Sequence, residues 1–276
     1  MPSPPANYLA EPSQFLSPML AVTQPHPFDH VSWWYEVKWD GFRAIVSNAE
    51  TLQIFSRRGH NLLARFPEFA VLHELLPAPV VLDGEVVALD QQTGTPREPS
   101  ALNARDAGRV LIAFDCLYAQ GHWLLHQPMM DRREHLTRVL PMSGPVLLAP
   151  GVEGRGLQLL EEVHRLGLEG VMAKKKDSPY RPGQRTRSWQ KFFIYEKRMT
   201  WATWAEQKGG QWRWALQDPE TNHMVANIMA PSDWEPPPGA TELALRPVIR
   251  CAVWYRSLGA NGTLRHPRLA HWERLT

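Results

Sequence analysis

The stretch Tyr35-Glu36-Val37-Lys38-Trp39-Asp40-Gly41-Phe42-Arg43 predicts how the rest of the chain is organised. It places Lys38 at the end of an aromatic run, from Trp33 onward, that is typical of a buried strand. A charged lysine is costly in such surroundings, which favours the neutral, nucleophilic amine. A surface lysine beside a hairpin fits equally well, because Asp-Gly is a common hairpin turn. The other motifs of the chain have to decide between these interpretations.

Composition restricts the class of protein. The 276 residues are 43% hydrophobic, enough for one large domain or two smaller ones. No apolar run has membrane-spanning length, and the first residues do not have the pattern of a signal peptide. Cys116 and Cys251 are too few for a disulfide framework and fit free thiols in a reducing cytoplasm. We therefore expect a cytoplasmic protein, not a membrane protein.

The charge is unevenly distributed. The formal net charge is +2, yet residues 165–198 contain ten Lys and Arg against three Asp and Glu. Such a basic block favours a polyanionic partner, with a solvated charged face as the alternative.

Hydrophobic periodicity predicts an α+β domain followed by a small all-β domain. Residues 1–13 are proline-rich without apolar periodicity and are predicted to be disordered. Residues 14–194 combine short strands with helices over 66–76, 128–140 and 156–167. Within this domain, Asp83-Gly84 is predicted to form a turn between two strands. Residues 195–276 contain strands separated by Gly- and Pro-rich turns, in the style of an OB-like barrel.

Four further motifs carry charged or aromatic groups at strand ends. The full set is Lys38-x-Asp40-Gly41-x-Arg43, Asp83-Gly84-Glu85, Phe114-Asp115, Glu169-Gly170-Val171-Met172-Ala173-Lys174, and Arg185-x-Arg187-Ser188-Trp189-Gln190-Lys191. In this order and spacing they resemble the nucleotidyltransferase motifs of ATP-dependent DNA ligases. The wording of residues 35–41, 56–59, 82–90 and 177–183 is similar to the ligase domain of bacterial end-joining ligases and of small stand-alone bacterial ligases. The resemblance is strong over residues 18–194 and weaker over 248–268.

The resemblance implies a nucleotidyltransferase domain of the ATP-grasp-like kind, with antiparallel sheets and flanking helices, and an OB-fold domain after it. It implies that Lys38 attacks ATP to form a lysyl-AMP intermediate, with nicked double-stranded DNA as the substrate. The roles it implies for the other residues are adenine binding for Glu36 and Phe114, the ribose side for Arg43 and Glu85, phosphate contact for Arg57 (or its neighbour Arg58), α-phosphate neutralisation for Lys174, Arg185 and Lys191, and binding of Mg²⁺ or Mn²⁺ for Glu85 and Glu169. A monomer acting in DNA repair is expected.

Two departures from the family pattern stand out. Phe193 occupies a position where the family has a second lysine, so one phosphate-binding charge is missing there. Lys197 and Arg198 are the candidates to supply that charge instead. The chain also lacks the Arg-x-Asp-Lys motif near its C-terminus, for which Arg265, Arg268 and Arg274 are candidate substitutes. These departures keep two alternatives open: an RNA or mixed RNA/DNA ligase, and a degenerate ligase that binds nicks without sealing them.

Two other patterns are given simpler interpretations. His122 and His126 have the spacing of zinc ligands on a helix, but a third ligand in register is missing from the sequence. Cys116 and most tryptophans of residues 195–276 are expected to be core residues.

Overall fold

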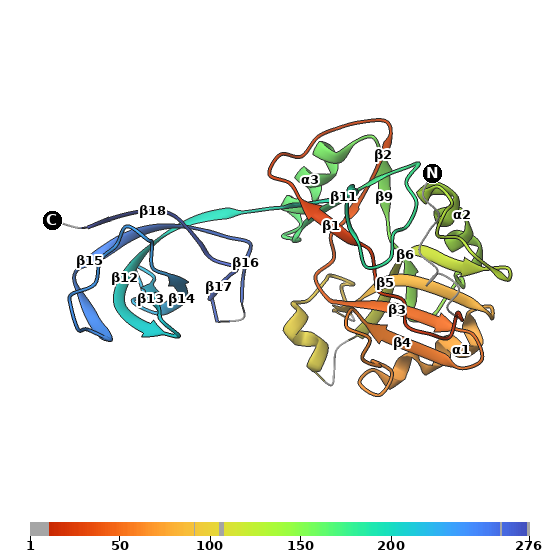
Figure 1. The fold of residues 1–276 in the computed structure, drawn as a ribbon, viewed down its shortest axis with the longest axis horizontal. Helices are drawn as coiled ribbons and strands as arrows, with labels where there is room; N and C mark the ends of the chain where they lie inside the picture. The colour runs from red at the N-terminus through yellow and green to blue at the C-terminus, as the bar shows by residue number, and fades with distance from the viewer. Residues whose placement is uncertain (1–10, 91, 105–107, 260, 275–276) are drawn as a thin grey trace. The chain divides into compact units, whose positions relative to one another are not determined.

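The structure is a computed structural model that describes residues 11–90, 92–104, 108–259 and 261–274. The chain divides into two compact units, the first ending at Phe192 and the second beginning at Phe193 (Figure 1). Within the described residues, no helix is long and apolar enough to cross a membrane.

The first unit contains two sheets. One sheet has the strand order β1-β11-β10-β2-β9, and the other has the order β4-β3-β5-β6-β7, with β8 pairing parallel to β6. The strands are β1 (Leu20–Thr23), β2 (Trp33–Val37), β3 (Phe42–Asn48), β4 (Leu52–Ser56), β5 (Val80–Leu89), β6 (Gly108–Ala119), β7 (His122–Trp123), β8 (Val146–Leu148), β9 (Gly151–Glu153), β10 (Gly170–Lys175) and β11 (Arg185–Phe193). The helices are α1 (Leu72–Leu75), α2 (Met129–Val139) and α3 (Gly156–Arg165), with short 3-10 helices over Pro67–Val71 and Pro99–Asn103.

Most neighbouring strands are antiparallel, and β1 pairs parallel to β11. The result is a mixed, sheet-rich α+β unit, which agrees with the class expected from the sequence.

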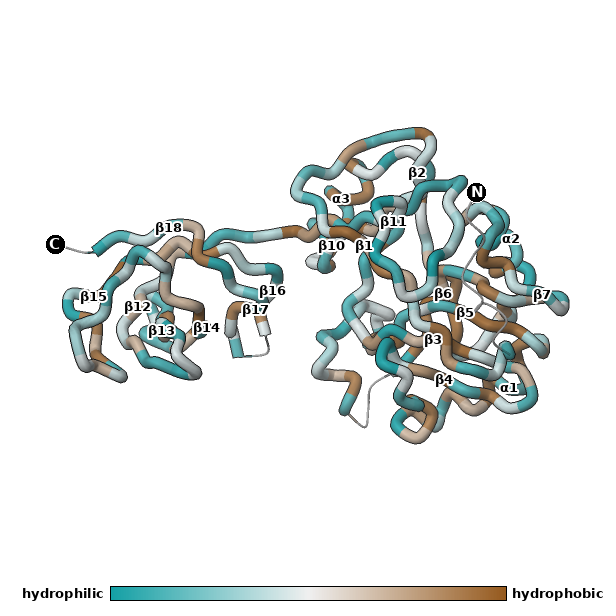
Figure 2. The backbone as a smooth tube through the Cα atoms, viewed as in Figure 1, coloured by the Kyte–Doolittle hydropathy of each residue, from teal (hydrophilic) through white to brown (hydrophobic). Residues whose placement is uncertain are grey.

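Two hydrophobic cores lie on opposite faces of the second sheet. Ala44 and Val46 of β3 belong to one core, and Ile45 between them belongs to the other, as the two-residue period of a strand requires. The core around Ile45 also contains Trp189 of β11, so it lies between the two sheets. In Figure 2 the hydrophobic segments concentrate where β5 and β6 run through the unit.

The chain passes from the first sheet to the second between β2 and β3. The residues of this crossing are Lys38 to Gly41, so Asp40-Gly41 does not close a hairpin. A Cβ atom on Gly41 would lie 2.1 Å from the Val86 carbonyl oxygen, so the crossing approaches β5 too closely for any side chain.

Three local predictions were wrong. Asp83-Gly84 is not a turn: β5 runs unbroken through it, with a bulge against β6 between these two residues. A Cβ on Gly84 would lie 2.7 Å from the Ile112 carbonyl oxygen, so glycine permits the close packing of β5 against β6 there.

The segment 66–76 is split into a 3-10 helix and the short α1, because Pro67 starts the first turn. Residues 11–13 form a turn held by Ser47 Oγ, which donates to the Pro12 carbonyl at 2.5 Å; residues 1–10 lie outside the described residues.

The second unit is all-β. Its main sheet has the order β14-β13-β12-β15-β18, with a separate hairpin of β16 and β17. The strands are β12 (Glu196–Lys208), β13 (Gln211–Gln217), β14 (Met224–Met229), β15 (Glu242–Tyr255), β16 (Ser257–Leu258), β17 (Leu264–Arg265) and β18 (Arg268–Arg274). Trp214 and Trp234 are buried in its core as expected, whereas Trp204 and Trp254 are exposed.

Candidate active site

A cavity of about 790 Å³ opens in the first unit, with walls from both sheets. Nine residues singled out from the sequence line it together: Glu36, Lys38, Arg43, Arg57, Glu85, Phe114, Lys174, Arg185 and Lys191. They come from six strands, the crossing after β2 and the turn after β4, so this cavity is the candidate active site.

Lys38 is positioned by the first sheet. Its backbone N–H donates to the Gly170 carbonyl at 2.8 Å, which places it beside the start of β10. Glu169, directly before that strand, forms an ion pair with the Lys38 ammonium, and the two side chains are 11% and 19% exposed. Lys38 is thus a partly enclosed amine held by a carboxylate, and not a surface lysine beside a hairpin turn.

Glu36 is buried, and its carboxylate has three protein donors. Trp34 Nε1 donates to Oε1 at 3.0 Å, and Arg133 Nη1 lies 3.3 Å from the same oxygen. Lys174 Nζ lies 2.6 Å from Oε2. Burial lowers the pKa of Lys174, and the adjacent Glu36 carboxylate opposes that effect.

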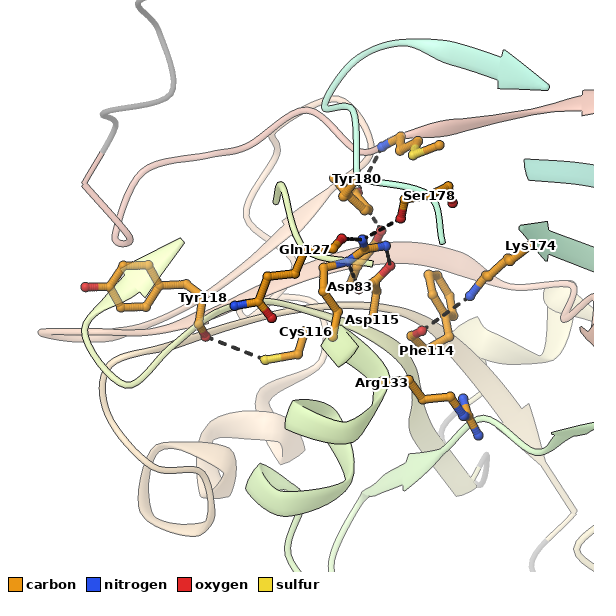
Figure 3. Close-up of polar contacts among 12 residues, drawn as sticks. Asp83, Phe114, Asp115, Cys116, Tyr118, Gln127, Arg133, Lys174, Ser178 and Tyr180 are labelled. Carbon is orange, nitrogen blue, oxygen red and sulfur yellow. Dashed lines mark hydrogen bonds and ion pairs between the residues drawn. The ribbon is translucent and has the colours of Figure 1, made fainter. Parts of the chain in front are cut away.

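Lys174 also lies 3.3 Å from the Phe114 carbonyl oxygen and 4.3 Å from the centre of the Phe114 ring. Figure 3 shows its side chain directed at Phe114. The ammonium that resemblance assigns to a phosphate is therefore held beside the Glu36 carboxylate and an aromatic ring.

Arg43 is held by a buried carboxylate. Its Nε and Nη2 donate to the two oxygens of Asp83, each at 2.5 Å, and Tyr180 Oη donates to Asp83 Oδ2 at 2.6 Å. Burial by itself would lower the pKa of the Arg43 guanidinium, but Asp83 raises it above its ordinary value. Asp83, Tyr180 and the neighbouring Asp115 gather at the centre of Figure 3.

Glu85 pairs with Arg43 across β3 and β5, and both side chains line the cavity. Burial raises the pKa of Glu85 to about 7, although Arg43 and then Lys38 act in the opposite direction. Glu85 therefore titrates close to neutral pH.

Aromatic and apolar side chains form part of the cavity wall. Phe114 packs edge-on against Trp189, with ring centres 6.2 Å apart, and Met172 of β10 also lines the cavity. Arg57 and Arg58 follow β4 and are exposed, while Arg185 donates to the Ala21 carbonyl.

The carboxylates available for a metal are few. Glu169 contacts Lys38, and Glu85 is close enough for Lys38 to affect its charge. In the part of the chain that the structure describes, no three His, Cys, Asp or Glu side chains cluster as a metal site. His122 and His126 do not lie one turn apart on a helix, as the zinc spacing would require, because His122 lies in β7 and residues 122–126 are not helical.

Phe193 and its candidate substitutes Lys197 and Arg198 contact other residues of the second unit. The guanidinium of Arg256 lies 3.4 Å from the centre of the Phe193 ring. Arg198 Nη2 pairs with Asp218 at 2.5 Å, and Lys197 lies over the Trp254 ring. Arg265 lies in β17, and Arg268 and Arg274 mark the two ends of β18.

Sequence reasoning missed the residues that hold the cavity residues in place. These are Trp34, Asp83 as the partner of Arg43, Arg133 and Tyr180. The adjacent Arg132 and Arg133 in a predicted amphipathic helix were an available signal, since buried arginines need carboxylate partners. Arg132 is fully buried and forms two hydrogen bonds with Asp115, at 2.7 and 2.8 Å.

A lysine among cations, carboxylates and an aromatic ring, in a cavity between two sheets, defines a candidate nucleotide-binding site. The model of the ATP dependent DNA ligase domain matches residues 18–192. The chain therefore belongs to the ATP-dependent DNA ligase family.

Particular relatives agree with this assignment. The multifunctional non-homologous end joining protein LigD of Mycolicibacterium smegmatis is 37% identical over 207 residues, which are 73% of this chain and 27% of LigD. The SPbeta prophage-derived DNA ligase-like protein LigB of Bacillus subtilis is 30% identical over 66% of this chain and 68% of its own length. The chain thus spans about a quarter of the length of LigD.

Solved structures show the same fold. A mycobacterial DNA ligase D complexed with ATP and MES has a TM-score of 0.60 and 26% identity, with 95% of this chain and 96% of that chain covered. The ligase domain of LigD from M. tuberculosis gives a TM-score of 0.61 at 25% identity, over 94% of this chain and 95% of that chain.

Proposed function

We propose that the chain is an ATP-dependent DNA ligase that seals 5′-phosphate/3′-hydroxyl nicks through a covalent lysyl-AMP intermediate at Lys38. The observation that carries the proposal is the position of Lys38 in a cavity shared with Arg43, Lys174, Arg185 and Lys191. A nucleophilic amine surrounded by fixed cations suits attack on a phosphate, because phosphoryl-type transfer depends on positioning and charge stabilisation.

The proposed reaction has three steps. The Lys38 amine attacks the α-phosphorus of ATP, so that an N–P bond forms and the bond to pyrophosphate breaks. An oxygen of the DNA 5′-phosphate then attacks the same phosphorus and releases Lys38. Finally, the 3′-hydroxyl attacks the activated 5′-phosphate, forms the phosphodiester and releases AMP.

Lys38 has to be neutral before the first step. The contact between the Lys38 ammonium and Glu169 therefore has to be given up before attack.

The carboxylates of Glu85 and Glu169 fit a divalent cation, because both lie near the Lys38 ammonium where a cation is already accommodated. Mg²⁺ is typically bound by one or two carboxylates together with substrate phosphates, so a third protein ligand is not required. When bound, Mg²⁺ or Mn²⁺ would neutralise phosphate charge at the reacting centre.

We assign the remaining cavity residues by their surroundings. Glu36 would accept a hydrogen bond from the adenine amino group, and Phe114 would contact the base. Arg43 and Glu85 would contact the ribose side. Arg57, Arg185 and Lys191 would contact phosphates. Lys174 is proposed to serve Glu36 at the base end of the cavity, because its ammonium is already paired there.

DNA is the proposed polyanionic partner, held by the basic residues of 165–198 and by the second unit acting as an OB-fold domain. Because the relatives include end-joining proteins, a role for this chain in DNA repair, as a cytoplasmic monomer, is part of the proposal. Phe193, at a position where the family has a second lysine, is the feature that favours a nick-binding protein without sealing activity as the second candidate.

Intact-mass measurement tests the proposal. The protein incubated with ATP and Mg²⁺ or Mn²⁺ should gain one AMP, and Lys38→Ala should gain none. Sealing of a nicked DNA duplex should follow, and a nicked RNA-containing duplex tested beside it should be a poorer substrate. No adduct with either metal would refute the lysyl-AMP mechanism; sealing of RNA nicks alone would refute the choice of DNA.

A further inference from the structure

The Glu36 carboxylate is held from behind by two residues outside the cavity wall. Glu36 and Lys174 are among the described residues that line the cavity. Trp34 and Arg133 do not belong to this lining. Trp34 and Arg133 both reach Oε1, whereas Lys174 reaches Oε2. The two oxygens of one carboxylate are therefore in different environments.

Counting lone pairs shows which oxygen can still accept a hydrogen bond. Each carboxylate oxygen has two lone-pair sites. The donors Trp34 Nε1 and Arg133 Nη1 occupy both sites of Oε1, at 3.0 and 3.3 Å. Lys174 occupies one site of Oε2, at 2.6 Å, so one acceptor site remains on Oε2.

Arg133 is itself fixed in place. Its Nη2 donates to the Ala149 carbonyl at 2.7 Å, and its guanidinium lies 4.4 Å from the centre of the Trp34 ring. The residue is buried on α2, and Figure 3 shows its side chain extending from that helix. Arg133 therefore holds Glu36 by a direct contact and also through the indole that it stacks on.

Trp34 has little freedom to move. Gly151 pairs with Glu36 across β2 and β9, and a Cβ atom at Gly151 would lie 2.6 Å from Trp34 Nε1. The missing side chain at Gly151 leaves the space in which the indole N–H points at Glu36. One strand pair thus positions both the carboxylate and one of its donors.

We infer that Arg133 and Trp34 are positioning residues that set the specificity of the cavity for a 6-aminopurine. By fixing Oε1, they aim the remaining acceptor site of Oε2 into the cavity, where it can accept from an exocyclic amino group. A base that presents a carbonyl at that position would meet a carboxylate oxygen and be rejected. The inference rests on the proposed role of Glu36 in adenine binding.

Equilibrium binding tests this inference without the covalent step. Calorimetric titrations of the full chain carrying Lys38→Ala would compare ATP with purine riboside 5′-triphosphate, which lacks the amino group. Adding Arg133→Met or Trp34→Phe should weaken ATP binding about tenfold, the scale of one charge-assisted hydrogen bond. Binding of the analogue should change less than about twofold, since it makes no bond to Glu36.

The analogue serves as the internal check on folding, because a general structural defect would weaken both nucleotides equally. Arg138→Met, at an exposed position on the same helix, is the matched control and should alter neither affinity. Equal weakening of ATP and analogue, or unchanged ATP binding, overturns the inference.

The same titrations separate this inference from the proposed function. If Lys38→Ala alone binds ATP and the analogue equally, Glu36 does not bind the amino group, and the proposed role and this inference fail together. If Lys38→Ala prefers ATP, and the preference disappears with Glu36→Gln but persists with Arg133→Met and Trp34→Phe, this inference alone fails.

Discussion

Replacing Asp83 with asparagine tests whether the buried ion pair with Arg43 stabilises the first unit. Asp83 is completely buried, and it accepts two hydrogen bonds from Arg43 and one from Tyr180. Removing one partner of a buried ion pair typically costs about 3–5 kcal/mol, because the other charge is left uncompensated. The Arg43 side chain is 19% exposed, so water compensates part of the loss and we expect about 3 kcal/mol.

Urea unfolding followed by circular dichroism measures this loss. With a slope of about 3 kcal/mol per molar urea, the midpoint of the first unit should fall by about 1 M. Arg43 should also lose its fixed position in the cavity wall, so formation of the AMP adduct should slow in the same variant.

Two further variants make the reasoning refutable. Glu134→Gln breaks an exposed pair with Arg138 and should leave the midpoint nearly unchanged. The double variant Asp83→Asn with Arg43→Met should lose clearly less stability than the sum of the single variants, since the two groups interact directly. A loss below about 1 kcal/mol for Asp83→Asn, or simple additivity in the double variant, would show that the pair contributes little.

The remaining predictions concern the other side chains described above. Burial raises the pKa of Glu85 from 4.5 to about 7, so between these values the native state binds more protons than the unfolded chain, and its stability falls as pH rises. Glu85→Gln removes this loss: its stability advantage over wild type should grow from about pH 4.5 and level off above about pH 7, reaching about 3 kcal/mol in urea titrations; an advantage independent of pH would contradict the assignment. Gly41→Ala should destabilise the first unit by more than about 2 kcal/mol, because its Cβ would lie 2.1 Å from the Val86 carbonyl oxygen; an unchanged urea midpoint would show that the crossing can shift. Phe193→Lys should lower the thermal stability of the second unit by about 1 kcal/mol, because it exchanges an attractive contact with Arg256 for a repulsive one; a more stable variant with faster AMP transfer would instead support a phosphate role at this position.

The positions of charged and aromatic residues near strand ends were predictable from the sequence, because each motif lies within or beside a short apolar segment. Lys38 follows an aromatic run and Glu169 precedes an apolar one, so placing both near a strand end required only local pattern. The helices α2 and α3 were also recognised, since their apolar residues recur at helical spacing.

Pairing between distant residues was not predictable. Arg133 is 97 positions from Glu36, and nothing local indicates that α2 lies behind β2. The pairing of Lys174 with Glu36 follows from the antiparallel register of β10 and β2, which a single sequence does not reveal. Asp83-Gly84 misled for a related reason: the pair has the composition of a turn, but glycine is required there by the close approach of β6.

The crossing from β2 to β3 has to span the distance between the two sheets. The number of residues between Lys38 and Arg43 therefore has to match that distance. Lys38 leaves one sheet, and Arg43 lies on the other, where it faces the cavity while its neighbour Ala44 faces the opposite core. One inserted residue would reverse that alternation, turning the guanidinium into an apolar core and a methyl group toward the nucleotide. A change in the length of this motif would therefore disturb both the cavity and the core on the opposite face of the sheet.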